Sequence, residues 1–175
     1  MANTNGRLFN VGTWIESDVT TYNVATLFEG GQLGQIWERN GITYQIALLK
    51  STSSAVVAGT PVMWSDFSNF VVSAKVSDAK RNFIAGIGLG TVTAGNYIVI
   101  QVAGPYALAV QDGLTTAAGD VLVMSATDGQ LTVVTAGTAP TYIEVGVATG
   151  VNVLVAAGTL ASSTVPLQIR VPLNI

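Results

Sequence analysis

Apolar positions along this chain come in short runs, and three of these runs follow the same small turn. An Ala-Gly pair, one or two polar or proline residues and then an apolar run recur at residues 58–64, 94–100 and 118–124. Glycine supplies backbone angles that other residues avoid, and β-branched residues favour extended chain. Each phrase therefore predicts a turn that leads into a buried strand.

A hairpin is predicted just before the first of these phrases. Residues 35–39 and 42–46 are strand-like and are separated by Asn40-Gly41, a pair that favours the two-residue turn of paired strands. Short strand-like runs then recur as far as Val155, broken by turn residues. The pattern predicts an all-β fold, a small barrel or sandwich of short antiparallel strands.

Three segments differ in their pattern. Residues 1–32 contain isolated large apolar side chains without a sustained period, so we expect an extended N-terminal arm, in which residues 22–29 are compatible with a short helix. Residues 33–156 are expected to form the barrel body with its leading hairpin. Residues 157–175 form a tail with prolines at 166 and 172, which predicts a strand at a sheet edge or against a neighbouring molecule.

Charged residues are scarce. They make up 10% of the chain, against about 25% in an ordinary globular domain, whereas 49% of the chain is hydrophobic. Such a surface favours burial against other protein, so a homo-oligomer is expected. The net charge is -3 and no Lys or Arg lies between Arg81 and Arg170, so neither nucleic acid nor a membrane is an expected partner. The N-terminus lacks the pattern of a signal peptide, and no apolar run has the length of a membrane helix.

The chain contains neither cysteine nor histidine, which excludes disulfides, thiolate chemistry and imidazole catalysis. Gly86, Gly88 and Gly90 resemble a phosphate-binding loop, but neither a helix pattern nor a P-loop lysine follows. We interpret these glycines as bends or close strand contacts.

Acidic residues offer two further candidate sites. Asp112, Asp120 and Asp128 have oxygen ligands that would suit calcium, but their spacing matches no EF-hand loop and two of them precede glycine in expected turns. Carboxylates could also pair in space for glycoside hydrolysis. The residues considered for such a pair are Glu38, Asp66, Asp78 and Glu144. We expect neither a metal site nor a catalytic pair.

Lysine and tryptophan residues complete the set of candidates. Lys50 beside Ser51 and Ser53 could form a Ser/Lys pair, but solvated loop residues explain the same sequence more simply. No catalytic residue and no cofactor are expected, and the chain is not expected to be an enzyme. Among the tryptophans, Trp64 is assigned to the core and Trp14 to an interface, and Trp37 is left open between the two.

The order of the strand-like segments carries a resemblance to a known family. The segments are 34–44, 56–63, 84–90, 98–106, 118–123 and 145–148. Their order, a leading hairpin followed by Ala-Gly and Gly-rich strands, resembles that of the small β-barrel head decoration (capsid cement) proteins of tailed bacteriophages. The resemblance covers about residues 34–150.

The resemblance implies a structural protein on the outer surface of a virion, bound to the major capsid protein and often trimeric, with a dimer as the alternative. Attachment is expected through large apolar residues of the arm, because such residues anchor interfaces. The expected capsid-binding residues are Phe9, Trp14, Ile15, Leu27 and Phe28. The alternative is a β-rich tail or fibre component that attaches to the host, and a secreted carbohydrate-binding module is a more distant one.

Overall fold

The computed structural model describes residues 33–78, 84–112, 115–134, 144–150, 153–154 and 163–170. They form eleven strands of one sheet, so the predicted all-β fold is confirmed. No helix of the length and apolar character needed to cross a membrane occurs among them. In chain order the strands are β1 (Ile36–Arg39), β2 (Ile42–Leu49), β3 (Pro61–Asp66), β4 (Val71–Ser73), β5 (Ile84–Gly88), β6 (Tyr97–Gln111), β7 (Val121–Met124), β8 (Leu131–Val133), β9 (Glu144–Ala148), β10 (Val153–Leu154) and β11 (Ser163–Arg170).

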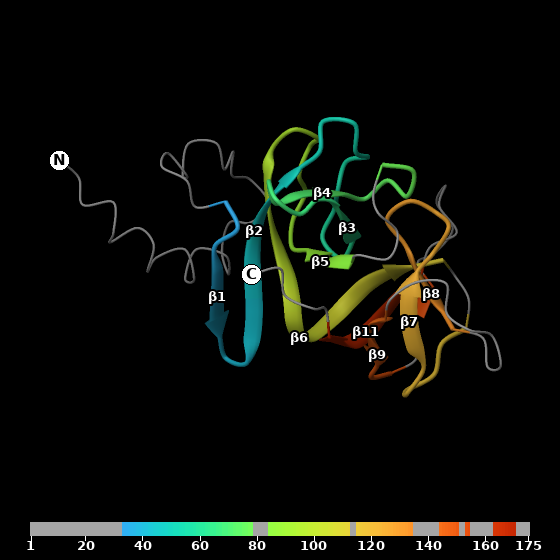
Figure 1. Ribbon diagram of the computed structural model, residues 1–175. Coiled ribbons are helices and arrows are strands. Elements are labelled where there is room, and N and C mark those ends of the chain that lie inside the picture. Colours follow the sequence, from blue (N-terminus) through green and yellow to red (C-terminus); the bar gives the residue numbers. More distant parts are fainter. Residues whose placement is uncertain are drawn as a thin grey trace.

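Strand β6 holds two barrels together. It has 15 residues, and in Figure 1 it runs beside β2 and then bends toward β7 and β8. Its first half closes a ring in which β2 pairs with β4, β4 with β3, β3 with β5, and β5 and β2 with β6. Its second half closes another ring with β8, β7, β9 and β11. We call these rings the first and the second barrel.

The two barrels have the same topology and closely matching registers. Val62 pairs with Gly86 in the first barrel and Leu122 pairs with Gly146 in the second, so both partners lie 60 positions further along (62 to 122 and 86 to 146). A register shift follows each of these pairs. In both barrels the first strand pairs in parallel with the third, β2 with β4 and β6 with β8. The chain therefore contains a tandem repeat of one five-stranded unit.

The recurring Ala-Gly turns dock on strand ends in one common way. Gly59 donates its N–H to the carbonyl of Gly88 (2.9 Å), and Gly88 donates back to Thr60 (2.8 Å). Gly119 and Asp120 make the same two bonds with Ala148, both at 2.8 Å.

The third turn repeats this pattern. Gly95 and Asn96 bond to Leu49, the last residue of β2. All three turn glycines have a positive φ, and an apolar strand follows each turn, as the sequence predicts.

Each barrel has its own hydrophobic core. Trp64 fills the first and lies 5.5 Å from Phe67 and 6.2 Å from Phe70 between ring centroids. Its side chain is 1% exposed, which confirms the predicted core position. The buried residues of the first core are Ala47, Leu49, Val56, Val62, Trp64, Val72, Ala74, Ala85, Ile98, Ile100 and Val102. The buried residues of the second are Met63, Val76, Ile84, Ile87, Ala109, Leu122, Met124, Leu131, Val145, Ala148, Leu167 and Ile169.

The second core contains side chains from strands of the first barrel. Met63 on β3 and Ile84 and Ile87 on β5 belong to it, although Val62 and Trp64 beside Met63, and Ala85 beside Ile84, belong to the first core. Residues that alternate along a strand point to opposite faces of the sheet, so one wall serves both cores. The barrels therefore pack against each other through an apolar contact as well as through β6.

The predicted edge position of the C-terminal tail is wrong for the part that the structure describes. Residues 167–169 of β11 pair with β6 on one side and with β9 on the other, so the strand lies inside the sheet. Pro166 is tolerated because a register shift between Val165 and Leu167 leaves it without a ladder partner. Its carbonyl still accepts a bond from Thr149 (2.8 Å).

Two further features differ from the expectation of short antiparallel strands. The β2–β4 and β6–β8 pairs are parallel, and β6 is long. The predicted hairpin with its turn at Asn40-Gly41 is confirmed as β1 and β2, and both turn residues have a positive φ. The N-terminal arm, with its helix-compatible stretch 22–29, lies outside the described residues.

Glycine at the matching positions 86 and 146 allows a close approach of two strands. A Cβ on Gly86 would lie 2.5 Å from the carbonyl oxygen of Gln101, and a Cβ on Gly146 would overlap the carbonyl oxygen of Gln168. Because these oxygens belong to the paired backbone, they cannot move aside easily. The predicted role of Gly86 and Gly88 in close strand contacts is confirmed, since a Cβ on Gly88 would lie 2.7 Å from Val56.

We predict that Gly146→Ala lowers the free energy of unfolding by about 1–3 kcal/mol, because the added methyl group overpacks the contact between β9 and β11. Urea unfolding followed by circular dichroism measures this loss. Gly119→Ala is the matched control, since its Cβ would meet nothing within 4 Å and only its positive φ opposes the change. If Gly146→Ala lowers the free energy of unfolding no more than Gly119→Ala does, the close contact between β9 and β11 at Gly146 is contradicted.

Candidate functional site

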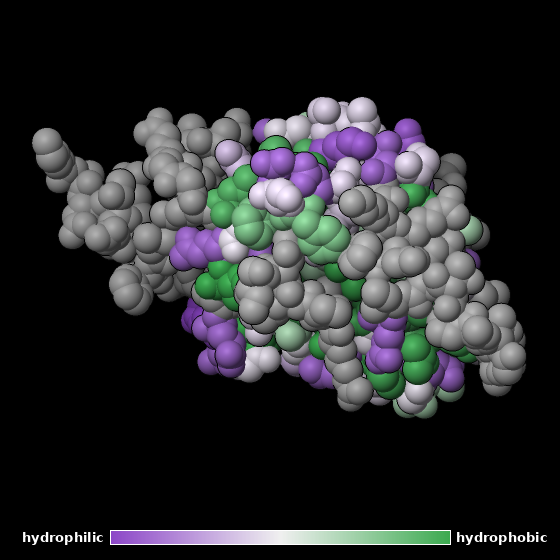
Figure 2. Space-filling model, in the orientation of Figure 1, coloured by the Kyte–Doolittle hydropathy of each residue, from purple (hydrophilic) through white to green (hydrophobic). Residues whose placement is uncertain are grey.

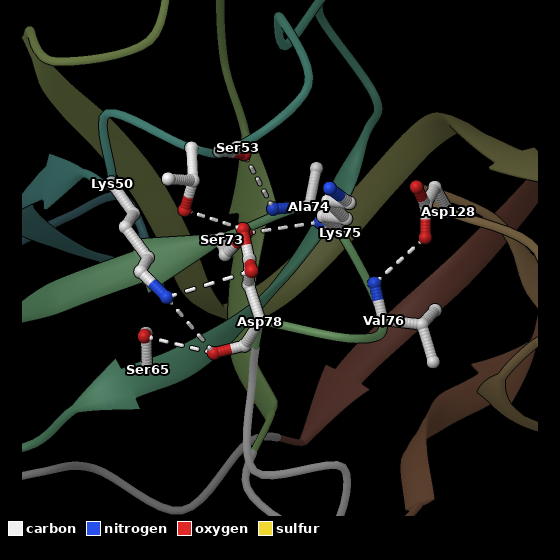
Figure 3. A network of polar contacts seen from close by, with 10 residues as sticks. Lys50, Ser53, Ser65, Ser73, Ala74, Lys75, Val76, Asp78 and Asp128 are labelled. Atoms are coloured by element: carbon white, nitrogen blue, oxygen red, sulfur yellow. Dashed lines mark hydrogen bonds and ion pairs between the residues drawn. The ribbon is translucent and has the colours of Figure 1, made fainter.

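A group of polar side chains in contact lies around Asp78, after β4 (Figure 3). Lys50 places its ammonium group 3.6 Å from a carboxylate oxygen of Asp78, and Thr52 donates its hydroxyl to the other oxygen at 2.6 Å. Ser65 donates to the backbone carbonyl of Asp78 at 3.0 Å. The group thus fastens the segment after β4 to the segment after β2 and to β3.

A second part of this network joins the two barrels (Figure 3). Asp128, in the turn between β7 and β8, accepts the backbone N–H of Val76 at 2.7 Å. The next residue, Gly129, donates its N–H to the carbonyl of Ala74 at 2.8 Å. The β7–β8 hairpin of the second barrel is therefore hydrogen-bonded to the segment that follows β4 of the first barrel.

The network does not form a Ser/Lys catalytic pair. Ser53 is buried, and its hydroxyl donates to the carbonyl of Ser54 and accepts the N–H of Ala74. Lys50 contacts Asp78 instead. The interpretation as solvated loop residues is wrong for Ser53, because its hydroxyl closes a buried backbone contact. The hydroxyl therefore supports the backbone here.

Hydrogen bonding and charge act on the Asp78 carboxyl. The hydroxyl of Thr52, followed by the charges of Lys50 and Lys75, holds the pKa of Asp78 below its ordinary value of 3.8. Its ionised form is thus favoured in the folded chain. The carboxylate acts as an acceptor that holds two loops, which needs no proton transfer.

The structure keeps the three candidate calcium ligands apart. Asp120 caps its own turn by accepting the N–H of Ala117 at 2.8 Å, and Asp128 binds Val76. Asp112 follows β6 and donates its backbone N–H to Leu131. Among the described residues, no three acidic side chains lie close enough together to hold a metal ion.

The four carboxylates considered for glycoside hydrolysis lie on different elements. Glu38 is on β1, Asp66 ends β3, Asp78 follows β4 and Glu144 begins β9. Asp66 accepts bonds from the backbone of Ser68 and Asn69 and thereby shapes its own turn. Asp78 likewise accepts the hydroxyl of Thr52, so both carboxylates are used to hold loops.

Large apolar side chains are exposed at one place on the described surface. Val57 is 51% exposed and Leu108 is 60% exposed. Their segments lie side by side, because Gly59, two residues after Val57, accepts the backbone N–H of Val110, two residues after Leu108, at 2.9 Å. Elsewhere, hydrophilic and hydrophobic residues are interspersed on the face shown in Figure 2. We call the surface formed by Val57 and Leu108 the apolar edge.

The expected capsid-binding residues of the arm lie outside the described residues. They are Phe9, Trp14, Ile15, Leu27 and Phe28. Trp37 lies on β1, but its side chain is not among those described. The apolar edge was not recognised from the sequence, because single Val and Leu residues in strand-like runs look like core residues.

Comparison with known proteins identifies no relative. No model of a protein family matches the chain, and no curated protein matches it significantly. The function must therefore be argued from the residues themselves.

We predict that Thr52→Val raises the pKa of Asp78 toward 3.8, because the variant loses the hydroxyl that favours the carboxylate. Since the folded pKa is lowered, Asp78 stabilises the fold above its ordinary pKa, and this contribution disappears as the pH falls through the folded pKa. A carboxyl NMR titration of the full chain measures the change. Thr127→Val, at an exposed threonine, is the control and should leave the titration of Asp78 unchanged.

Proposed function

We propose that this chain is a structural virion protein that binds the outer surface of a phage capsid and cements the shell of the major capsid protein. The observation that carries the proposal is the order of the segments that resemble cement proteins. Residues 34–44 contain β1 and the start of β2, 56–63 contain the first turn and the start of β3, and 84–90 contain β5. Residues 98–106, 118–123 and 145–148 lie on β6, on β7 with its turn, and on β9.

The side-chain chemistry supports binding rather than catalysis. Each polar group of the network around Asp78 bonds to a neighbouring loop or backbone atom, so the network is used for support. A chain with 10% charged residues offers little electrostatic repulsion against a protein partner. We therefore assign the chain no enzymatic activity and no cofactor.

A cement protein must hold its own shape while it bridges other subunits. Two barrels that share β6 have few open strand edges, which limits uncontrolled edge-to-edge association. Attachment is assigned to the apolar residues of the arm, and a homo-oligomer, preferably a trimer, would multiply weak contacts through effective concentration. The major capsid protein is the proposed partner.

The copy number in purified virions tests the proposal. Quantitative mass spectrometry against the major capsid protein should find hundreds of copies per particle. A handful of copies would point to the tail or fibre alternative, and absence from the virion would overturn both.

We predict that Phe9→Ala combined with Trp14→Ala weakens binding to capsids at least about 30-fold, since the loss of even one buried aromatic anchor costs about 2 kcal/mol or more. Cosedimentation of the purified full chain with capsids that lack it measures this loss. Ala126→Asp, at an exposed turn of the second barrel, is the control and should bind normally. Unchanged binding of the double variant would contradict attachment through these two residues of the arm.

A further inference from the structure

Phe70, in the turn between β3 and β4, has a backbone conformation that bulky residues rarely adopt. Its φ is 50°, and among the described residues other than glycine only Asn40, in the β1–β2 turn, also has a positive φ. The corresponding turn between β7 and β8 of the second barrel uses a glycine, Gly129, for its positive φ of 65°. Glycine adopts a left-handed backbone without steric cost, but an aromatic residue is strained there. The β3–β4 turn therefore stores backbone strain at Phe70.

Two contacts hold the Phe70 ring in place. The first is with Trp64 of the first core, at 6.2 Å between ring centroids in an edge-to-face arrangement. The second is with Gly34, where an added Cβ would lie 2.5 Å from Cε2 and Cζ of the ring. Only glycine allows the backbone to approach a ring this closely. A strained residue persists where its surroundings fix it, and these contacts fix Phe70.

Gly34 belongs to a segment before β1 that is hydrogen-bonded to β2. Gly34 donates its N–H to the carbonyl of Ile46 at 2.8 Å, and Ile46 donates its N–H to the carbonyl of Gln35 at 3.0 Å. The buried side chain of Gln45 donates to the carbonyl of Gly34 at 3.3 Å. We call Gly34-Gln35 the strap. The strap is thus bonded to β2 and lies against the Phe70 ring at the same time.

The backbone of Phe70 is bonded to the same strand. Leu48, two residues after Ile46, donates its N–H to the carbonyl of Phe70 at 2.9 Å. A change of φ at Phe70 would therefore disturb a bond to β2 as well as the contact of the ring with the strap. Movement of the strap would in turn remove one of the two contacts that hold the ring. The strap and the β3–β4 turn are coupled in both directions.

We propose that the strap and Phe70 form a strained clasp with two states. In the closed state, which the structure shows, the strap lies against the ring and Phe70 has a positive φ. In the open state the strap leaves β2, and Phe70 relaxes to a negative φ. Backbone strain favours opening and the contacts of the strap favour closure. A pull on the chain that precedes Gly34 therefore shifts the clasp toward the open state.

The use of the clasp rests on the proposed function. If residues of the arm attach to a capsid, they pull on Gly34 through the covalent chain. Opening then makes the Phe70 ring and the backbone of Ile46 accessible next to the attached arm. The clasp would thus report attachment of the arm to the first barrel.

Nuclear magnetic resonance of the purified full chain tests the clasp without any capsid. In the native chain, Phe70 should show the strong contact between its own amide and α protons that a positive φ produces. Gly34→Ala places a methyl group against the ring, so we expect this signal to weaken. The amides of Ile46 and Leu48 should exchange with solvent at least about fivefold faster. The amide of Lys50, which bonds to β4, should keep its rate.

Gly41→Ala is the matched control. Gly41 also has a positive φ and lies in the adjoining β1–β2 turn, but a Cβ there would meet nothing within 4 Å. This variant should leave the Phe70 signal and the exchange of Leu48 unchanged. Equal effects of the two substitutions would overturn the clasp, and so would a Gly34→Ala chain in which Phe70 keeps its positive φ.

A second variant keeps the clasp testable if Gly34→Ala does not fold. Phe70→Ala removes the ring, so it should by itself speed the exchange of the Ile46 amide. Adding Gly34→Ala to it should then accelerate that exchange no more than Gly41→Ala does in the native chain, because the new methyl group has room. A larger acceleration, or a double variant that does not fold, would overturn the clasp. Failure of capsid binding would leave these results unaffected, so the two proposals fail separately.

Discussion

The pairing of β6 on both of its sides is the constraint on which the rest of the structure depends. Its first half closes the first barrel by pairing with β2 and β5. Its second half closes the second barrel by pairing with β8 and β11. At Ala103 the strand pairs with Thr43 on one side and Arg170 on the other, so neither barrel can close without it. The apolar wall of β3 and β5 then adds a core contact between the two barrels.

The sequence predicts the local elements well, because turns and hairpins depend on few residues. The Ala-Gly turns and the hairpin at Asn40-Gly41 follow from glycine and asparagine at positions with positive φ. The tandem repeat is hidden, since matched core positions carry different apolar residues, such as Trp64 and Met124. Cores tolerate such exchanges when total volume is conserved, so the packing leaves little trace in the sequence.

Long-range pairing explains the two fold predictions that fail. Short strands are expected, yet β6 continues through Gly104 and Pro105 because β11 pairs with both residues. Pro166 reads as an edge residue, yet a register shift accommodates it inside the sheet. Likewise, Ser53 resembles a solvated residue until Ala74, 21 positions away, is found to bond to it. In each case the deciding partner is remote in the sequence.

The continuity of β6 also has a mechanical consequence. The ladder bonds of antiparallel strands lie perpendicular to the strand axis. A force that pulls the two barrels apart along β6 therefore loads many of these bonds at once in shear, instead of opening them one after another. Tension between the two barrels is therefore carried along a single unbroken strand, which both rings enclose.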